Sequence, residues 1–307
     1  MSELGKKLAE KWLSLVVLPG ALYLVVLAAV VALGHAHPFD VGHLVDTITS
    51  GAAAPEVRSA GGQVVLLLAI LGGAAVIGLV AQALGAMVER LWLASDWRSW
   101  PKPLRALADR QVRRRHRTWV ALAVAYGHQR ERAARALAIG EPTDKGERAV
   151  AYRALQRVSV EEPDRPSWSG DRIHAVSVRI LRDLQVDLPV VWPYLWLTVS
   201  EAIRTELVAA RQVLGQATML SAWAVLYLPL VGLWWPAPLL SVALGLTSWS
   251  RTRTAADNYA ALLEATVRLH GRELADRLGL AADAPFGTQI GADLTRHLTP
   301  SPPSLLT

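Results

Sequence analysis

The chain has 307 residues, of which 52% are hydrophobic and only 19% are charged, and its formal net charge is +6. This charged share lies below the roughly 25% of a typical soluble domain, so the composition favours an integral membrane protein. The chain contains no cysteine, which excludes disulfides, thiolate catalysis and cysteine metal sites.

The first apolar segment, residues 13–34, is long enough to cross a bilayer as a helix. Lys6, Lys7 and Lys11 precede it, as basic residues also precede the apolar part of a signal peptide. The apolar run is longer than the roughly 7–15 residues of a signal peptide, so we expect a retained signal-anchor helix. Pro19 and Gly20 should kink its first turns, since proline removes a helical hydrogen bond.

The second apolar segment, Ser59 to Val88, contains no ionisable side chain, and we expect a membrane helix at about residues 61–88. Between the two spans, Asp40, Asp46 and Glu56 outnumber Arg58, which predicts an extracytoplasmic loop. Residues 1–93 therefore form a first transmembrane hairpin.

Small side chains recur along one face of this second span. The candidates for close helix packing are Ala74, Gly78, Ala81 and Gly85, because small residues let membrane helices approach one another. Gln82 is the strongly polar side chain inside the span. We expect it to hydrogen-bond to a neighbouring helix or a backbone group, and a place in a permeation path is the alternative.

Residues 94–211 carry most of the lysines and arginines, which is typical of the cytoplasmic side. We expect a helical cytoplasmic module, with Trp92, Trp97 and Trp100 as an interfacial belt before it. Its densest basic run supplies candidates for a lipid-facing patch: Arg110, Arg113, Arg114, Arg115 and Arg117. Such a run attracts anionic lipid, and it can also bind nucleic acid or form a solvated helix face. Nucleic acid is the disfavoured reading of the three.

A second transmembrane hairpin is expected at residues 212–252, since residues 212–250 are uncharged and too many for one crossing. Leu233 to Pro238 would form its turn, and a single long kinked span is the alternative. A cytoplasmic amphipathic helix should follow at residues 253–280. The Gly-, Pro-, Ser- and Thr-rich residues 281–307 read as a disordered tail.

The run RPSWSGDRIHAV, then DLPVVWPYLWL, an apolar hairpin and the helix YAALLEATVRLHGRELADRLG resembles uncharacterised multi-span membrane proteins of high-GC actinobacteria. Members of that family carry a similar P-T-x-x-G-[ND] and D-x-x-x-x-W-P-x-L-W pattern. The resemblance covers about Arg165 to Leu280. It implies paired apolar segments that flank a cytoplasmic region, and it implies no activity.

No catalytic motif for a metalloprotease, nucleotide-binding loop, hydrolase elbow or kinase is present. We therefore expect a non-enzymatic, all-α integral membrane protein with four spans, no cofactor and no bound metal. Both termini should lie on the cytoplasmic side of the plasma membrane. The expected role is a membrane-anchored scaffold that binds anionic lipid or a protein partner on the cytoplasmic face. The alternative is a homo-oligomeric channel or transporter, lined by Gln82, Ser221 or Thr247.

Overall fold

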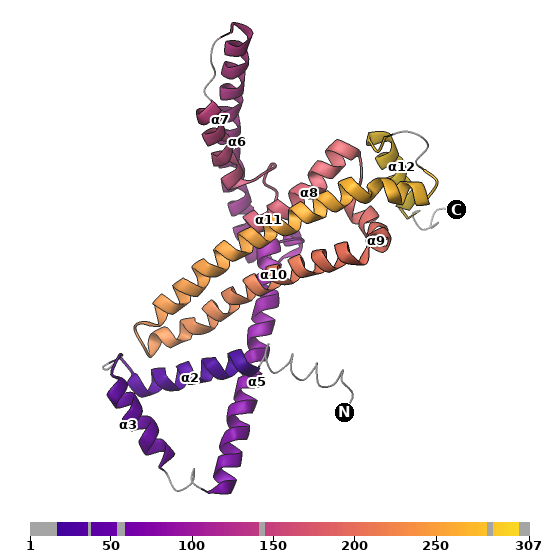
Figure 1. Cartoon of the computed structure of the whole chain (residues 1–307). Coiled ribbons are helices and arrows are strands. Elements are labelled where there is room, and N and C mark those ends of the chain that lie inside the picture. Colours follow the sequence, from indigo (N-terminus) through magenta and orange to yellow (C-terminus); the bar gives the residue numbers. More distant parts are fainter. Residues whose placement is uncertain (1–16, 36–37, 54–58, 141–144, 281–284, 301–307) are drawn as a thin grey trace. The chain divides into compact units, whose positions relative to one another are not determined.

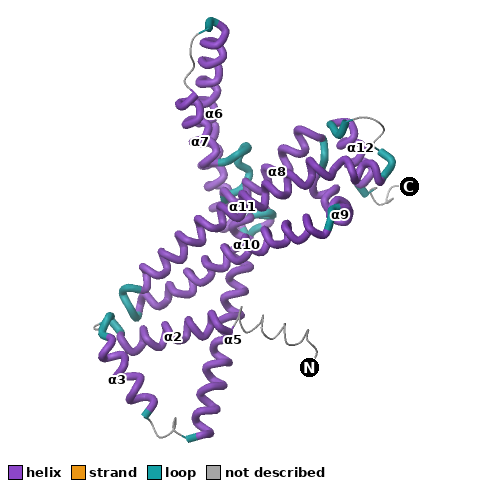
Figure 2. The backbone as a smooth tube through the Cα atoms, viewed as in Figure 1, coloured by secondary structure: helices purple, strands orange, loops and turns teal. Residues whose placement is uncertain are grey.

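The structure of the chain is a computed structural model that describes residues 17–35, 38–53, 59–140, 145–280 and 285–300. These residues form ten α-helices and no strand (Figure 2). The all-α prediction is confirmed for this part of the chain. Lys6, Lys7, Lys11 and the first residues of the expected span, 13–16, lie outside the described residues.

The chain divides into two compact units, which we call unit 1 and unit 2. Unit 1 comprises Met1–Glu89 and Gly215–Arg251, and unit 2 comprises Arg90–Leu214 and Thr252–Thr307. The boundaries fall within three long helices, α5 (Ala60–Leu93), α10 (Glu201–Tyr227) and α11 (Ala237–Arg277).

Unit 1 contains α2 (Leu18–Leu33), α3 (Val41–Ala52) and most of α5 (Figure 1). Pro19 lies in the first turn of α2, where a proline costs no helical hydrogen bond. The Tyr23 hydroxyl of α2 donates to the backbone oxygen of Leu226, 3.0 Å away. Part of the expected extracytoplasmic loop forms the helix α3. The Asp40 carboxylate caps the start of this helix by accepting a hydrogen bond from the backbone N–H of His43 at 2.9 Å.

The second half of unit 1 is an antiparallel helix pair rather than one long kinked helix (Figure 1). α10 leads into the 3-10 helix η3 (Leu228–Gly232), and α11 runs back beside it. Ser248 of α11 contacts α10 twice, with its hydroxyl 2.6 Å from the backbone oxygen of Ala217 and 2.7 Å from the Ser221 hydroxyl.

Within the described residues, two helices, rather than the four expected, are long and apolar enough to cross a membrane: Ala60–Leu93, and α10 extended through η3 to Gly232. The described part of α2 is apolar but shorter. In α11, only residues 237–250 precede the charged side chain of Arg251. In the described residues, helix length and apolar character therefore support two of the four expected spans.

After the last turn of α5, unit 2 continues with the 3-10 helix η2 (Trp97–Ser99) and a long helical hairpin. The hairpin consists of α6 (Lys102–Ala138) and α7 (Lys145–Val158), whose tyrosines Tyr126 and Tyr152 stack with ring centroids 5.3 Å apart. Trp97 is buried rather than part of an exposed interfacial belt, and its ring N–H donates to the backbone oxygen of Asp164 at 3.0 Å.

The main core of unit 2 lies among α8 (Trp168–Leu184), α9 (Leu188–Thr198), α11 and α12 (Thr288–Leu298). The tail prediction is wrong for residues 285–300, because α12 is helical and buries Leu294 and Leu298 in this core. Thr295 fixes α12 by accepting a hydrogen bond from the backbone N–H of Asp187 at 3.0 Å.

Candidate functional site

Four of the basic side chains of α6 lie on one face of the helix, opposite its buried face. Arg110, Arg113, Arg114 and Arg117 are all exposed. They are spaced three and four residues apart, so they are neighbours on the helix surface. Their side chains border a surface hollow together with Leu107, Gln111 and Thr118. We call these four arginines the basic face of α6.

The positive charge of the basic face is not neutralised by any carboxylate of the described residues. In the described residues, none of the four arginines forms an ion pair with a carboxylate. Arginines elsewhere in unit 2 do, as Arg179 does with Glu264 at 2.7 Å and Arg268 with Asp183 at 2.7 Å. Arginine binds phosphate and carboxylate oxygens strongly, so the basic face is available to an external anion.

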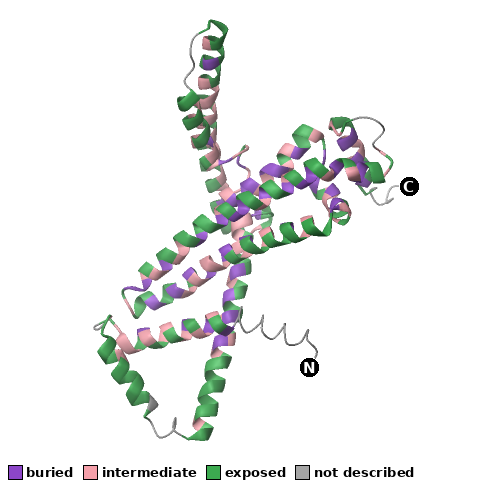
Figure 3. Cartoon of the chain, viewed as in Figure 1, coloured by how far each residue is buried: buried purple, intermediate pink, exposed green. Residues whose placement is uncertain are grey.

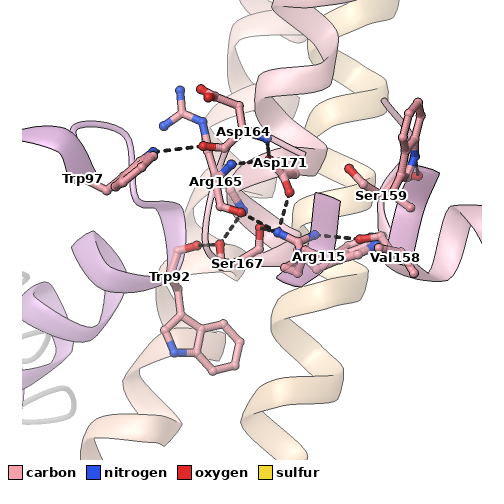
Figure 4. A network of polar contacts seen from close by, with 12 residues as sticks. Trp92, Trp97, Arg115, Val158, Ser159, Asp164, Arg165, Ser167 and Asp171 are labelled. Atoms are coloured by element: carbon pink, nitrogen blue, oxygen red, sulfur yellow. Dashed lines mark hydrogen bonds and ion pairs between the residues drawn. The ribbon is translucent and has the colours of Figure 1, made fainter. Parts of the chain in front are cut away.

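Arg115 does not belong to this face, which corrects the predicted lipid-facing patch. At about 100° per residue it lies roughly 150° from the middle of the basic face. Its guanidinium is largely buried and donates to the backbone oxygens of Val158, Arg165 and Ser167 at 2.6, 2.6 and 2.8 Å (Figure 4). It also pairs with the carboxylate of Asp171. This anchoring fixes the rotation of α6 about its axis and keeps the basic face outward.

Asp171, in the first turn of α8, organises the segment that precedes this helix (Figure 4). Its other oxygen accepts the backbone N–H groups of Arg165 and Asp164 at 2.8 and 3.0 Å. Burial raises the pKa of the Asp171 carboxyl above its ordinary value, while the Arg115 charge and the two backbone hydrogen bonds oppose that rise. Ser167 caps α8 through the N–H of Gly170 at 2.9 Å and donates its hydroxyl to the backbone oxygen of Trp92.

Arg165 completes the network by joining it to the end of α5. One of its nitrogens donates to the backbone oxygen of Ala94 at 2.6 Å, and another lies 3.3 Å from Nδ1 of His174. Burial lowers the pKa of Arg165, and burial together with the Arg165 charge lowers the pKa of His174. The groups around Asp171 thus bond mainly to one another and to the backbone, so their role is to hold α5, α6 and α8 together.

The small-residue candidates in α5 lie together on the side of the helix that is buried (Figure 3). Ala74, Gly78, Ala81 and Gly85 are the buried residues of this helix within the described chain. Gly85 faces Met219 of α10, and Ala74 faces Gly20 of α2. Sequence reasoning missed the packing role of Gly20, although its lack of a side chain was a signal for close approach.

Gln82 is exposed on α5, and its side chain makes no hydrogen bond to any described residue. The expected bond to a neighbouring helix of the same chain is therefore wrong for the described residues. The other pore-lining candidates have local partners: Ser221 contacts Ser248, and Thr247 donates to the backbone oxygen of Ala243 at 2.7 Å.

Comparisons with protein-family models, with curated proteins and with solved structures found no match for this chain. The resemblance to uncharacterised actinobacterial membrane proteins stays a prediction.

Proposed function

We propose that this protein is a non-enzymatic, membrane-anchored scaffold whose basic face of α6 binds anionic lipid at the cytoplasmic surface. Unit 1 would lie in the bilayer, with two helical hairpins, and unit 2 would form the cytoplasmic module. The observation that carries the proposal is the basic face itself. Its four exposed arginines lack internal carboxylate partners and are held outward by the anchoring of Arg115.

The burial pattern of α5 supports membrane insertion. Its buried side is made of alanine and glycine, while large side chains such as Leu68 and Leu79 are 63% and 54% exposed. A core helix of a soluble protein would bury its large apolar side chains instead. Small residues inside and large aliphatic residues outside are typical of a helix that packs within a bilayer and presents its outer face to lipid.

The position of α6 in the chain supports contact with the lipid surface. Residues 94–101, between α5 and α6, reach at most ~28 Å when fully extended, so the first turns of α6 stay near the end of α5. Each basic residue near an anionic membrane contributes about 1 kcal/mol. Four such residues supply enough attraction to hold α6 at the membrane surface, provided that they lie within the Debye length of about 8 Å.

The test uses the full-length protein in nanodiscs and the absence of native cysteines. Gln111→Cys places a fluorescent probe among the four arginines, and a nitroxide on the lipid headgroup reports contact by quenching. We expect stronger quenching by an anionic lipid than by a zwitterionic lipid that carries the same nitroxide. Equal quenching by the two lipids would contradict the proposal and favour a protein partner.

A matched pair of double variants distinguishes lipid binding by the basic face from a general effect of positive charge on α6. Replacing Arg113 and Arg114 by Gln should weaken the preference for anionic lipid by about 2 kcal/mol, or roughly 30-fold. Replacing Arg130 and Arg132 by Gln removes the same charge from the same helix, away from the basic face. This control should change the preference far less.

One observation favours the second candidate, a homo-oligomeric channel. Gln82 is exposed on an apolar helix surface without a hydrogen-bond partner among the described residues, and a polar amide in hydrocarbon is stabilised by a partner on another helix. Conductance recording on the reconstituted protein distinguishes the candidates. A reproducible ion-selective current that Gln82→Leu abolishes would establish the channel instead of the scaffold.

A further inference from the structure

An apolar groove lies on the surface of unit 2, between α9 and α10. Its volume is about 590 Å³. Its walls are formed mainly by Trp192, Trp196, Leu197, Val208, Arg211 and Tyr259.

The groove exists because α9 is apolar on more than one side. Leu188, Val191 and Leu195 fill the core of unit 2, while Leu197 remains 72% exposed. Trp192 and Trp196 lie side by side at the surface, with ring centroids 6.0 Å apart. A helix that is apolar all round is normally covered by another apolar phase, and the described residues of the chain leave the groove open.

The groove lies next to the start of an uncharged stretch on the same helix. Arg211 is the last charged residue before residues 212–250, and α10 continues unbroken through this point. At a rise of 1.5 Å per residue, Arg211 is only about 6 Å along the helix from Gly215. If α10 enters the bilayer here, as the proposed function requires, the groove opens at the membrane surface. Tryptophan and tyrosine are enriched at this depth.

The polar side chains that line the groove suit a phosphate group. Arg211 lies close to Tyr259, where burial raises the pKa of the Tyr259 hydroxyl and the Arg211 charge partly opposes the rise. Both residues line the groove, so the Tyr259 hydroxyl and the Arg211 guanidinium can donate to the same bound group. Arginine and a neighbouring hydroxyl are favourable donors to phosphate oxygens.

We infer that this groove binds a membrane phospholipid, with an acyl chain against Trp192, Trp196 and Leu197 and the phosphate at Arg211. A second apolar groove, on α10 and α11 in the same unit, differs from this one in the charge of its lining residues. The second groove, of about 580 Å³, includes Glu201 and Glu206 among its lining residues. Glu201 pairs with Arg204 at 3.3 Å, but the Glu206 carboxylate repels a phosphate, so the phospholipid binds at Arg211 rather than there.

The inference is tested with single-cysteine variants of the full-length protein in nanodiscs, each carrying the same small fluorophore. Leu197→Cys reports on the phospholipid groove, and Leu269→Cys on the acid-lined groove. Leu79→Cys reports on the outer face of α5, and Leu137→Cys on an exposed position of α6. Nitroxide-labelled phospholipid should quench the probes at Leu197 and Leu79 several-fold more than those at Leu269 and Leu137.

The outcomes separate this inference from the proposed function. Quenching at Leu79 without quenching at Leu197 would overturn the groove assignment and leave the membrane anchor in place. A probe at Leu197 with blue-shifted emission but no lipid quenching would show that protein covers the groove, and would also overturn the assignment. Absence of quenching at both Leu197 and Leu79 would contradict both proposals.

A second measurement tests the phosphate. The same nitroxide is placed on the acyl chain of phosphatidylglycerol or of diacylglycerol, which lacks the phosphate. Phosphatidylglycerol should quench the Leu197 probe more strongly, and Arg211→Gln should remove the difference. Equal quenching by the two lipids in the wild-type background would overturn phosphate recognition at Arg211.

Discussion

The contact between Gly20 and Ala74 gives a sharp prediction about how unit 1 is packed. A Cβ atom added at Gly20 would lie 2.8 Å from the carbonyl carbon of Ala74 and 3.1 Å from its Cα. Carbon atoms prefer separations of about 3.5–4.0 Å, so Gly20→Ala must part α2 and α5 by roughly 1 Å. Overpacking of this kind costs about 1–3 kcal/mol, whereas the better helix propensity of alanine regains at most ~1 kcal/mol.

Gly72→Ala is the matched control, because Gly72 is exposed on α5 and a Cβ atom there meets no other atom within 4 Å. The assay is thermal unfolding of both variants in the same detergent. We expect Gly20→Ala to unfold roughly 2–10 °C below the Gly72→Ala variant. Equal midpoints for the two variants would refute close packing of α2 on α5.

Three further predictions concern unit 2. Asp171→Asn leaves the buried guanidinium of Arg115 without its counter-charge and should lower the free energy of unfolding by about 3–5 kcal/mol. Arg98→Gln breaks an exposed ion pair with Asp164 and should lower it by only about 0–1 kcal/mol. Similar unfolding midpoints for the two variants would contradict a stabilising role of the Arg115–Asp171 pair. Burial and the Arg165 charge lower the pKa of His174. The contribution of neutral His174 to stability is therefore present above about pH 6.5 and is lost as the pH falls below that value. Unfolding midpoints measured against pH should show this loss, and His174→Gln should make the midpoint depend less on pH. Gly291→Ala places a Cβ atom 2.8 Å from Val186, so it should expose α12 to limited proteolysis, while Gly287→Ala, with its nearest atom 3.8 Å away, should not.

Much of the helical architecture could be predicted because its signals are local. The uncharged stretch in α5 and the run of helix-forming residues in α6 and α7 each specify a helix without long-range information. The spacing of Ala74, Gly78, Ala81 and Gly85 also placed them on one face, and that face is the buried one. Here the helix period alone determines which side chains lie together.

The prediction placed Arg115 with the exposed arginines because all five belong to one basic run of the sequence. The available signal was the apolar set Ala108, Val112 and Trp119, which shares the helix side of Arg115 and faces the interior. Its acceptors are backbone oxygens of residues 158–167, some 43 to 52 positions away in the sequence. Such partners follow from tertiary packing and not from local pattern.

Composition misled the reading of the C-terminal residues. Their glycine, proline and threonine content is typical of a disordered tail, yet Ile290, Leu294 and Leu298 recur every four residues on the buried side of α12. The helix is held by packing on other elements: Leu294 and Leu298 lie in the core, and Thr295 bonds the segment between α8 and α9. Intrinsic propensity is a weak guide when tertiary contacts supply most of the stability.

The proposed membrane anchor requires that α5 crosses the membrane and places α3 and α6 on opposite sides. Modification of single cysteines by a membrane-impermeant maleimide in intact cells tests it most directly, with Ser50→Cys in α3, Leu79→Cys in α5 and Leu137→Cys in α6. We expect that Ser50→Cys reacts in intact cells, that Leu137→Cys reacts only after permeabilisation, and that Leu79→Cys stays unreactive in both. Reaction of Ser50→Cys and Leu137→Cys from the same side, or rapid reaction of Leu79→Cys, would contradict it.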